Sequence, residues 1–263
     1  NTAKEVEDEK DLEDMEMMVE EVKESASGKI IFKTLINVMK VLAQFKNPRA
    51  IHKEPQFWEF YLEFLQHKNS GLQKYALDCI VNYKNKSIVA YKSHLYNLID
   101  DKKFKEELTL FKITEESKNI QPEDREHIVP IILRILYGKM TSKLGADKKG
   151  GGQARRSIIM RYLAGCSENE LKVFIEMAFP QLKQYMDMEP KEINETILSS
   201  LDLKSVLSIG KIHSILNLFE VIREYFGGYM KNQLLSQFFK IFYAVCVNIY
   251  GVLSQTEKVH IAF

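Results

Sequence analysis

Residues 127–165 read HIVPIILRILYGKMTSKLGADKKGGGQARRSIIMRYLAG, and this stretch decides the fold. Its first part has apolar residues at helical spacing, and Pro122 with the acids that follow it suits the first turn of that helix. Gly138 and then Gly145 are expected to end the helix. A second helix is expected from about Arg155, where apolar positions resume at the same spacing. Between the two helices lies a loop rich in glycine and lysine.

Positive charge is concentrated in this stretch. Residues 134–161 hold eight bases and one acid, Asp147, so their net charge is 8 − 1 = +7, and the rest of the chain must balance at −6 because the total is +1. The bases are Arg134, Lys139, Lys143, Lys148, Lys149, Arg155, Arg156 and Arg161. This separation of positive charge from the rest of the chain is more informative about binding partners than the total net charge, which is near zero.

The composition is that of a helix-rich protein. The 263 residues include only 12 glycines and 6 prolines and are 45% hydrophobic, which argues against a β-sandwich and against a disordered chain. The three cysteines are far apart and form no CxxC pair, so we expect reduced intracellular thiols. No apolar leader precedes residue 29, and we expect the chain to be a piece of a longer one.

Further apolar stripes at three- and four-residue steps predict helices elsewhere in the chain. Ser167 and Glu170 form a capping box that begins another helix, which Pro180 should kink or break. No alternating strand pattern of useful length is found. The predicted helices cover 31–45, 55–65, 72–80, 88–98, 104–111, 171–185, 190–201, 212–226 and 229–253.

The pair over 55–80 resembles a HEAT repeat. Asn69, Leu72, Gln73, Ala76 and Ile80 match the pattern of a second helix, with Asn69 where that pattern has Asp and Gln73 where it has Arg or Lys. No single pair can bury its own apolar stripe, but stacked pairs can. We therefore predict an all-α fold, a HEAT-like α-solenoid of stacked antiparallel helix pairs over 28–263, with a basic glycine and lysine loop at 144–154.

Residues 1–27 are predicted to be a separate acidic segment. Within residues 1–24, eleven acids stand against three lysines, a net charge of −8. We favour a mostly flexible, solvated segment with a docked helical turn or two. The alternative is an acidic arm that meets a basic partner.

Pro130 constrains the start of the first helix in the deciding stretch. Proline costs little near a first turn but about 3 kcal/mol in a helix interior. We therefore predict a helix start or a kink between Glu126 and Pro130.

The final helix is apolar nearly all round. Residues 234–253 read LLSQFFKIFYAVCVNIYGVL, which is long enough to span a bilayer. Lys240 near its middle, three polar residues and the lack of a flanking aromatic and basic belt argue against a membrane. We expect a soluble helix inside the stack with one apolar face open, which a following repeat of a longer chain would cover.

Signals of catalysis are missing from the sequence. The six histidines show no metal spacing, the cysteines suit buried small side chains better than nucleophiles, and no paired-carboxylate or GxSxG arrangement occurs. The run Lys148–Gly152 lacks the spacing of a phosphate-binding P-loop and no strand precedes it. We expect no enzyme, no cofactor, no metal and no small-molecule substrate.

Phosphate contact without catalysis is a separate possibility. The candidate residues are Lys139, Lys143, Lys148, Lys149, Arg155, Arg156 and Arg161, some on a flexible loop and some near a helix N-terminus that favours anions. From the residues alone, a phosphate-binding surface and a merely solvated insertion are equally supported.

The same stretch resembles the down-regulated-in-metastasis family. Residues 127–140 (HIVPIILRILYGKM) and 156–165 (RSIIMRYLAG) carry the resemblance, and shorter matches extend it over most of residues 30–225. The acidic start and the last helix carry no matching motif.

This family comprises a giant nucleolar HEAT-repeat protein of the small-subunit processome. The resemblance implies a non-catalytic scaffold in the 90S pre-ribosome that supports processing of pre-ribosomal RNA to 18S rRNA, in the nucleus and nucleolus. It implies pre-ribosomal RNA, other processome proteins and further HEAT repeats as partners, and no membrane. The alternative is a HEAT-repeat scaffold or transport-receptor-like adaptor that binds only proteins.

Overall fold

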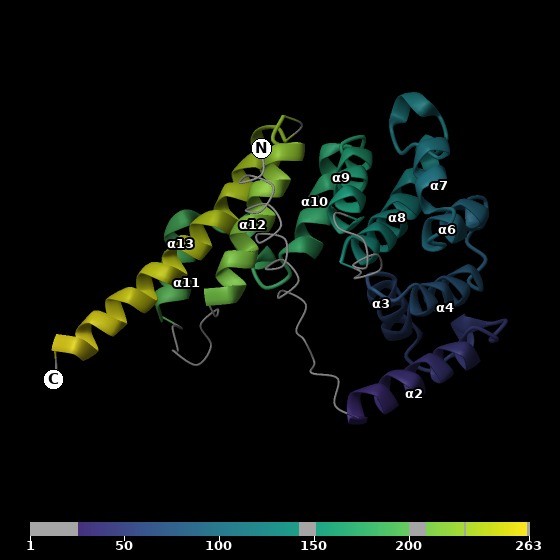
Figure 1. Ribbon diagram of the computed structural model, residues 1–263, viewed down its shortest axis with the longest axis horizontal. Coiled ribbons are helices and arrows are strands. Elements are labelled where there is room, and N and C mark those ends of the chain that lie inside the picture. The colour runs from purple at the N-terminus through teal and green to yellow at the C-terminus, as the bar shows by residue number, and fades with distance from the viewer. Residues whose placement is uncertain (1–25, 142–150, 200–208, 229, 262–263) are drawn as a thin grey trace. The chain divides into compact units, whose positions relative to one another are not determined.

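The computed structural model consists of α-helices joined by short turns (Figure 1). It describes residues 26–141, 151–199, 209–228 and 230–261, and at a few helix ends only their backbone. These residues contain no strand, which confirms the predicted all-α class. They fall into two compact units, one within Glu21–Glu170 and one within Leu171–Phe263.

The first unit contains a series of helices connected by turns and short 3-10 segments. They are α2 (Ala26–Leu42), η2 (Pro48–Ala50), α3 (Glu54–Leu65), α4 (Ser70–Val81), α5 (Lys86–Val89), α6 (Lys92–Ile99), α7 (Phe104–Leu110), η3 (Glu115–Ser117), η4 (Pro122–Asp124), α8 (Arg125–Met140) and α9 (Gly151–Leu163). The second unit follows with α10 (Glu168–Ala178), η5 (Lys183–Asp187), α11 (Pro190–Ser199), α12 (Ile209–Phe226) and α13 (Asn232–Ile261).

Helices α3 and α4 form the HEAT-like pair that the sequence predicts. Asn69 caps α4, because its side-chain oxygen accepts a hydrogen bond from the Leu72 N–H at 3.0 Å. Trp58 near the start of α3 contacts Tyr83 just beyond the end of α4, with ring centroids 4.8 Å apart, so the two helices are antiparallel.

Helix α2 stacks on this pair and runs parallel to α4. At one end, the Phe32 ring stacks on His67, which precedes α4. At the other end, the Asn82 side chain after α4 donates to the Ala43 carbonyl after α2 at 2.8 Å. Second helices of consecutive HEAT pairs have this parallel relation, so the structure agrees with a HEAT-like stack in this unit.

Helix α8 is the centre of the first unit. Nearly all its positions from Ile128 to Met140 are buried, and it packs against α3, α5, α6 and α9. A helix that is apolar on all sides is stable only when neighbours surround it. The stretch that decides the fold in the sequence is therefore the hub of this unit.

A close backbone contact fixes α8 against the turn between α3 and α4. The Gln73 side chain is fully buried, and its amide donates to the carbonyls of Leu65 at 2.7 Å and Ile135 at 3.0 Å. A Cβ at Gly138 would lie 2.4 Å from Gln73 Nε2 and 2.7 Å from the His67 carbonyl oxygen. Only glycine lets α8 approach this closely.

Several predicted boundaries need correction. Gly138 does not end its helix, since α8 continues to Met140, and the next helix begins at Gly151 rather than near Arg155. The last four residues of the predicted loop at 144–154 are thus helical. The predicted single helix over 88–98 is two helices, α5 and α6, interrupted at Ala90–Tyr91.

The predicted helix start between Glu126 and Pro130 is also wrong by one residue. A 3-10 turn at Pro122–Asp124 leads into α8 at Arg125, and Pro130 lies inside the helix. The proline removes one backbone donor near the helix start, where the surrounding apolar packing compensates. The alternative, a kink at Pro130, stays a prediction.

Aromatic packing builds the core of the second unit. Phe219 of α12 and Phe238 of α13 stack with centroids 3.9 Å apart, and Phe174 contacts Phe226 edge-on. On α13, Ala244 and Val247 pack against Ile193 and Ile197 of α11. As predicted, α10 ends before Pro180, and α12 ends just before Gly227.

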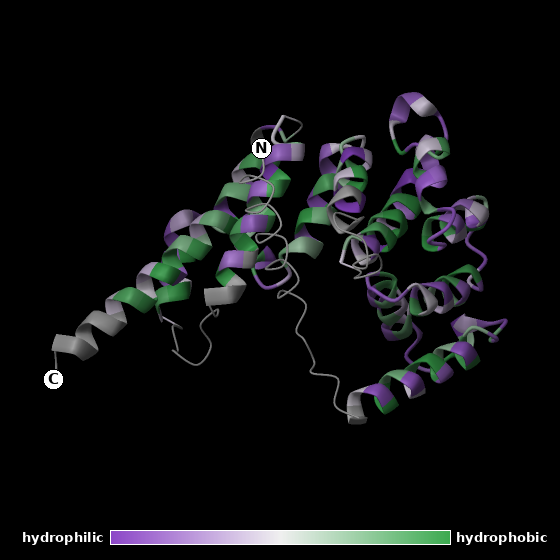
Figure 2. Cartoon of the chain, in the orientation of Figure 1, coloured by the Kyte–Doolittle hydropathy of each residue, from purple (hydrophilic) through white to green (hydrophobic). Residues whose placement is uncertain are grey.

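Helix α13 leaves part of its apolar surface open, as the sequence predicts. Within the described residues, Gln233–Ser254 is the one helix segment that is long and apolar enough to cross a membrane, and 39% of its apolar window is buried. Lys240 reaches Glu189 at 3.4 Å. Figure 2 shows α13 as largely hydrophobic. Its exposed large side chains are Phe239, Phe242, Tyr243, Tyr250 and Leu253.

Replacing Gly138 by alanine should destabilise the first unit. The new Cβ meets backbone as well as a side chain, so the free energy of unfolding should fall by about 2–3 kcal/mol. Gly228→Ala is the matched control, because a Cβ there meets nothing within 4 Å. Denaturant unfolding of both variants checks the contact, and equal stability would contradict it.

Changing Phe239, Tyr250 and Leu253 to serine should lower binding of a hydrophobic dye and self-association without lowering the melting temperature. These side chains are 52%, 65% and 59% exposed, so they contribute little packing to the fold. The matched change Phe238→Ser, at a side chain that is 1% exposed, should instead destabilise the protein. Partition of the unaltered chain into lipid vesicles would favour the membrane alternative.

Candidate nucleic-acid interface

A buried lysine anchors the C-terminal end of α8. The Lys139 side chain is 2% exposed, and its ammonium group donates to Asp101 Oδ1 at 2.7 Å and to the Ile99 carbonyl. It also lies 5.9 Å from the centre of the Phe104 ring. Burial lowers the pKa of Lys139, and the hydrogen bond and charge of Asp101 counteract that effect.

This anchor brings the turn between α6 and α7 to the end of α8. The turn has the sequence Asp100-Asp-Lys-Lys103, and Asp100 orders it by accepting the Lys102 backbone N–H at 2.8 Å. That hydrogen bond holds the pKa of Asp100 below its usual value. Asp101 forms an ion pair with Lys139. The exposed Lys102 and Lys103 are the cations that the turn presents to solvent.

The start of α9 adds arginines at the same end. Arg156 Nε donates to the carbonyl of Met140, the last residue of α8, at 3.3 Å. The charge of Arg155 contributes to the lowered pKa of Lys139, after burial, which places Arg155 near the same anchor. Both arginines are half-buried.

The local charge at this end is positive. Five bases stand against Asp100 and Asp101, so the described residues here carry 5 − 2 = +3. The five bases are Lys102, Lys103, Lys139, Arg155 and Arg156. The N-terminal end of a helix, here α9, favours anions as well.

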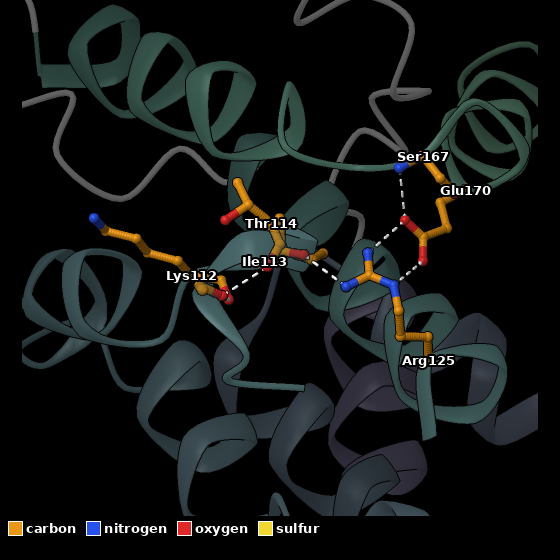
Figure 3. Close-up of polar contacts among 7 residues, drawn as sticks. Lys112, Ile113, Thr114, Arg125, Ser167 and Glu170 are labelled. Atoms are coloured by element: carbon orange, nitrogen blue, oxygen red, sulfur yellow. Dashed lines mark hydrogen bonds and ion pairs between the residues drawn. The ribbon is translucent and has the colours of Figure 1, made fainter. Parts of the chain in front are cut away.

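A second polar network fixes the other end of α8 (Figure 3). The Arg125 guanidinium makes a two-pronged contact with Glu170 at 2.8 and 2.9 Å and donates to the Ile113 carbonyl at 2.8 Å. Glu170 also accepts the Ser167 N–H at 2.8 Å, which is one half of the predicted capping box. Burial alone would lower the pKa of Arg125, but the hydrogen bonds and charge of Glu170 outweigh it and raise the pKa.

The segment between α7 and α8 clamps the end of α9. Tyr162 is buried and its hydroxyl donates to the Phe111 carbonyl at 2.8 Å. A Cβ at Gly165 would lie 2.5 Å from Thr114 Cγ2, so glycine permits the close approach. Helix α9 is therefore held at its far end by the segment after α7, while Arg156 near its start contacts the end of α8.

The seven predicted phosphate-binding residues differ in burial and in position, and the structure does not describe all of them. Lys143, Lys148 and Lys149 lie outside the described residues. Lys139 needs correction, because a buried ammonium group bonded inside the protein is not available to phosphate. Arg161 is exposed, but it lies six positions after Arg155 on the same helix. That spacing turns it about 120° around the axis, so the two arginines do not share one face.

Sequence reasoning missed Lys102 and Lys103. Their own pattern, two acids followed by two lysines, is electrically neutral and offers no signal. The sequence does predict a turn between two helices at these residues, but only the fold shows that this turn lies beside the end of α8.

In the part of the chain that the structure describes, Cys79 and Cys166 are buried and Cys246 is exposed. No group of three or more histidine, cysteine or acidic side chains there could hold a metal ion. Burial raises the pKa of the Cys79 thiol to about 12 and also raises that of Cys166, so neither is an activated nucleophile.

Comparison with known proteins connects these features to a family. The family described as "U3 small nucleolar RNA-associated protein 20, N-terminal" matches residues 29–262. The chain belongs to this family. The match confirms the resemblance found in the sequence and covers both units of the fold.

Two relatives carry the name U3 small nucleolar RNA-associated protein 20. The one from Saccharomyces cerevisiae is 26% identical over 226 residues, which is 85% of this chain and 9% of the relative. The one from Schizosaccharomyces pombe is 34% identical over 134 residues, which is 51% of this chain and 5% of the relative. The chain thus matches less than a tenth of the length of either relative.

Removing the Arg125 guanidinium should loosen the contact between the start of α8 and the first turn of α10. Arg125→Ala leaves Glu170, whose side chain is 15% exposed, without its cation, so the free energy of unfolding should fall by roughly 3 kcal/mol. Lys191→Ala breaks an exposed ion pair with Glu195 and should be nearly neutral. Chemical denaturation measures both, and an equally small effect of Arg125→Ala would contradict the role given to this network.

Proposed function

We propose that the chain is a segment of a non-catalytic scaffold in the small-subunit processome, the 90S pre-ribosome, and supports processing of pre-ribosomal RNA to 18S rRNA. The observation that carries this proposal is membership of a family whose relatives are named for association with U3 small nucleolar RNA. The proposed location is the nucleolus.

The proposed RNA contact is the basic end of the first unit. We define the basic surface as Lys102, Lys103, Arg155 and Arg156, and the proposal adds Lys143, Lys148 and Lys149, which lie outside the described residues. Lys139 is not part of this surface, but its hydrogen bond to Asp101 holds the turn with Lys102 and Lys103 in place. Cations from a turn and from a helix start can follow an irregular phosphate backbone, so the contact would be independent of base sequence.

A second function, binding of proteins alone, has an observation in its favour. Large apolar side chains are exposed on α2 and α13, and open apolar faces of this kind mark protein-binding surfaces. The protein-only adaptor and the RNA-contacting scaffold differ in one measurable property, which is salt-sensitive RNA binding.

Neutralising the basic surface should weaken RNA binding and reduce its dependence on salt. For Lys102→Gln, Lys103→Gln and Arg155→Gln combined, the slope of log affinity against log salt should drop by about 0.7 for each phosphate of a single-stranded RNA that the variant no longer neutralises. A second set, Lys143, Lys148 and Lys149 to glutamine, tests the loop in the same way. Fluorescence anisotropy across a salt series measures both quantities.

The matched control changes Lys74, Lys84 and Lys86 to glutamine. These lysines are exposed and lie in the same unit. Because three cations are replaced in each variant, the change in total charge is the same. The control should leave the slope close to that of the unaltered chain. If the control and the basic-surface variants weaken binding equally, affinity follows total charge and the proposed surface is wrong. If the unaltered chain does not bind RNA, the protein-only adaptor is the better account.

A further inference from the structure

An open cavity lies at the loop edge of the α3–α4 pair, and its volume is about 320 Å³. Helix α3 lines it with Glu54, Trp58 and Glu59, which share one side of the helix because they are adjacent or one turn apart. Arg49 of η2 and Tyr83, just after α4, line it as well. We call this space the α3 cavity.

Stacking of helix pairs does not cover the α3 cavity. The α3–α4 pair has neighbours on both sides, because α2 packs on α4 and α8 packs on α3. The cavity lies instead at the connections from α2 to α3 and from α4 to α5. Repeats of a solenoid contact only their consecutive neighbours, so a further repeat of the same stack would not reach this edge. A ligand of the α3 cavity therefore comes from outside the stack.

Tyr83 contributes a buried hydroxyl group to the α3 cavity. The residue is 9% exposed, and its hydroxyl has no hydrogen-bond partner of regular geometry. Burial raises the pKa of Tyr83, and the neighbouring Glu54 carboxylate raises it further. A buried polar group without a partner is costly, and in an open cavity a ligand can supply that partner.

The charged groups of the α3 cavity favour a cation. Glu54 and Glu59 stand against Arg49, so the lining carries 1 − 2 = −1. Neither carboxylate forms an ion pair with another residue that the structure describes. Trp58, which is half-buried, lies beside them on α3. An indole ring attracts cations over its face, and carboxylates accept the hydrogen bonds of a cation.

We propose that the α3 cavity binds an arginine side chain of another protein. A guanidinium group is planar and carries five N–H donors, so it can stack on an indole ring while it donates to carboxylates. Here the ring is Trp58 and the carboxylates are Glu54 and Glu59, and the Tyr83 oxygen accepts a further N–H. Lysine fits less well because its ammonium group is a compact charge without a flat face. The α3 cavity shares no residue with the basic surface, so the proposal is independent of the RNA contact.

A peptide titration followed at Trp58 tests the proposal. Trp58 is the only tryptophan of the 263 residues, so its indole N–H gives a single resonance in a nitrogen-15 spectrum of the whole chain. A Gly-Ser-Arg-Ser-Gly peptide with blocked ends should shift this resonance saturably. The same peptide with citrulline, which keeps the shape of arginine but lacks its charge, should bind at least about tenfold more weakly. The lysine peptide should bind about threefold more weakly.

Substitutions in the chain locate the bound arginine. Glu59→Gln, at an exposed position, should weaken binding about threefold, and Glu54→Gln with Glu59→Gln should weaken it at least about tenfold. Glu63→Gln is the matched control, because it removes the same charge from an exposed position one turn further along α3, outside the cavity. Arg49→Gln should strengthen binding of the arginine peptide about twofold, since a like charge is removed. Unchanged melting temperatures show that each variant still folds.

Cross-linking identifies the protein that supplies the arginine. A photo-reactive benzoylphenylalanine in place of the exposed Lys86 stands next to Asn85, which lines the α3 cavity. In the intact protein within its native particle, attachment of an arginine-containing peptide from another protein is expected. Glu54→Gln with Glu59→Gln should abolish this attachment.

Four results would overturn the proposal. The first is equal binding of the arginine and citrulline peptides, and the second is an equal effect of Glu59→Gln and Glu63→Gln. The third is a larger shift of the Trp58 resonance with guanosine monophosphate than with the arginine peptide, weakened by Arg49→Gln, which assigns the cavity to a nucleotide. The fourth is photo-attachment only to RNA or only to other segments of the same chain.

Discussion

The side chain of Gln73 holds the centre of the first unit together. Its amide group joins the end of α3 to the middle of α8, and it fits only because residue 138 is glycine. A buried amide without one of its acceptors would carry an unsatisfied donor into the core. This constraint fixes the position of α8, and helices α3, α5, α6 and α9 pack around it.

Polar anchors at both ends complete the placement of α8. Arg125 ties its start to Glu170 in the first turn of α10 and to the segment after α7, and Lys139 ties its end to the turn before α7. An apolar helix alone could rotate or slide among similar neighbours, whereas these directional bonds specify one register. The position of the turn follows from this arrangement, since the buried Lys139 holds the turn with Lys102 and Lys103 beside the end of α8.

Much of the fold could be predicted from local pattern. The Asn69 cap, the capping-box start at Ser167, the break at Pro180 and the end of α12 before Gly227 all depend on neighbouring residues, and the structure confirms them. Errors arise where tertiary contacts override local preference. The sequence predicts a helix end at Gly138 because its close contact with Gln73 is distant along the chain, and Pro130 is tolerated because α8 is surrounded by apolar neighbours.

The candidate site was harder to predict than the fold. A count of bases finds the charged stretch, but it cannot separate the buried Lys139 from exposed lysines or bring in Lys102 and Lys103, which are distant in sequence. Charge alone therefore indicates the region of the proposed site, and it includes the buried Lys139 while leaving out Lys102 and Lys103. Burial and pairing of individual cations are properties of the fold, which is why both corrections came from the structure.

The central claim is that RNA meets this chain at the end of α8 where α9 begins. Ultraviolet cross-linking of the intact protein in its native particle, followed by mass spectrometry of the attached peptides, tests it most directly. The account predicts RNA-linked peptides that contain Lys102 and Lys103 and peptides within residues 142–156. RNA cross-links found throughout the chain except in these two segments would contradict it.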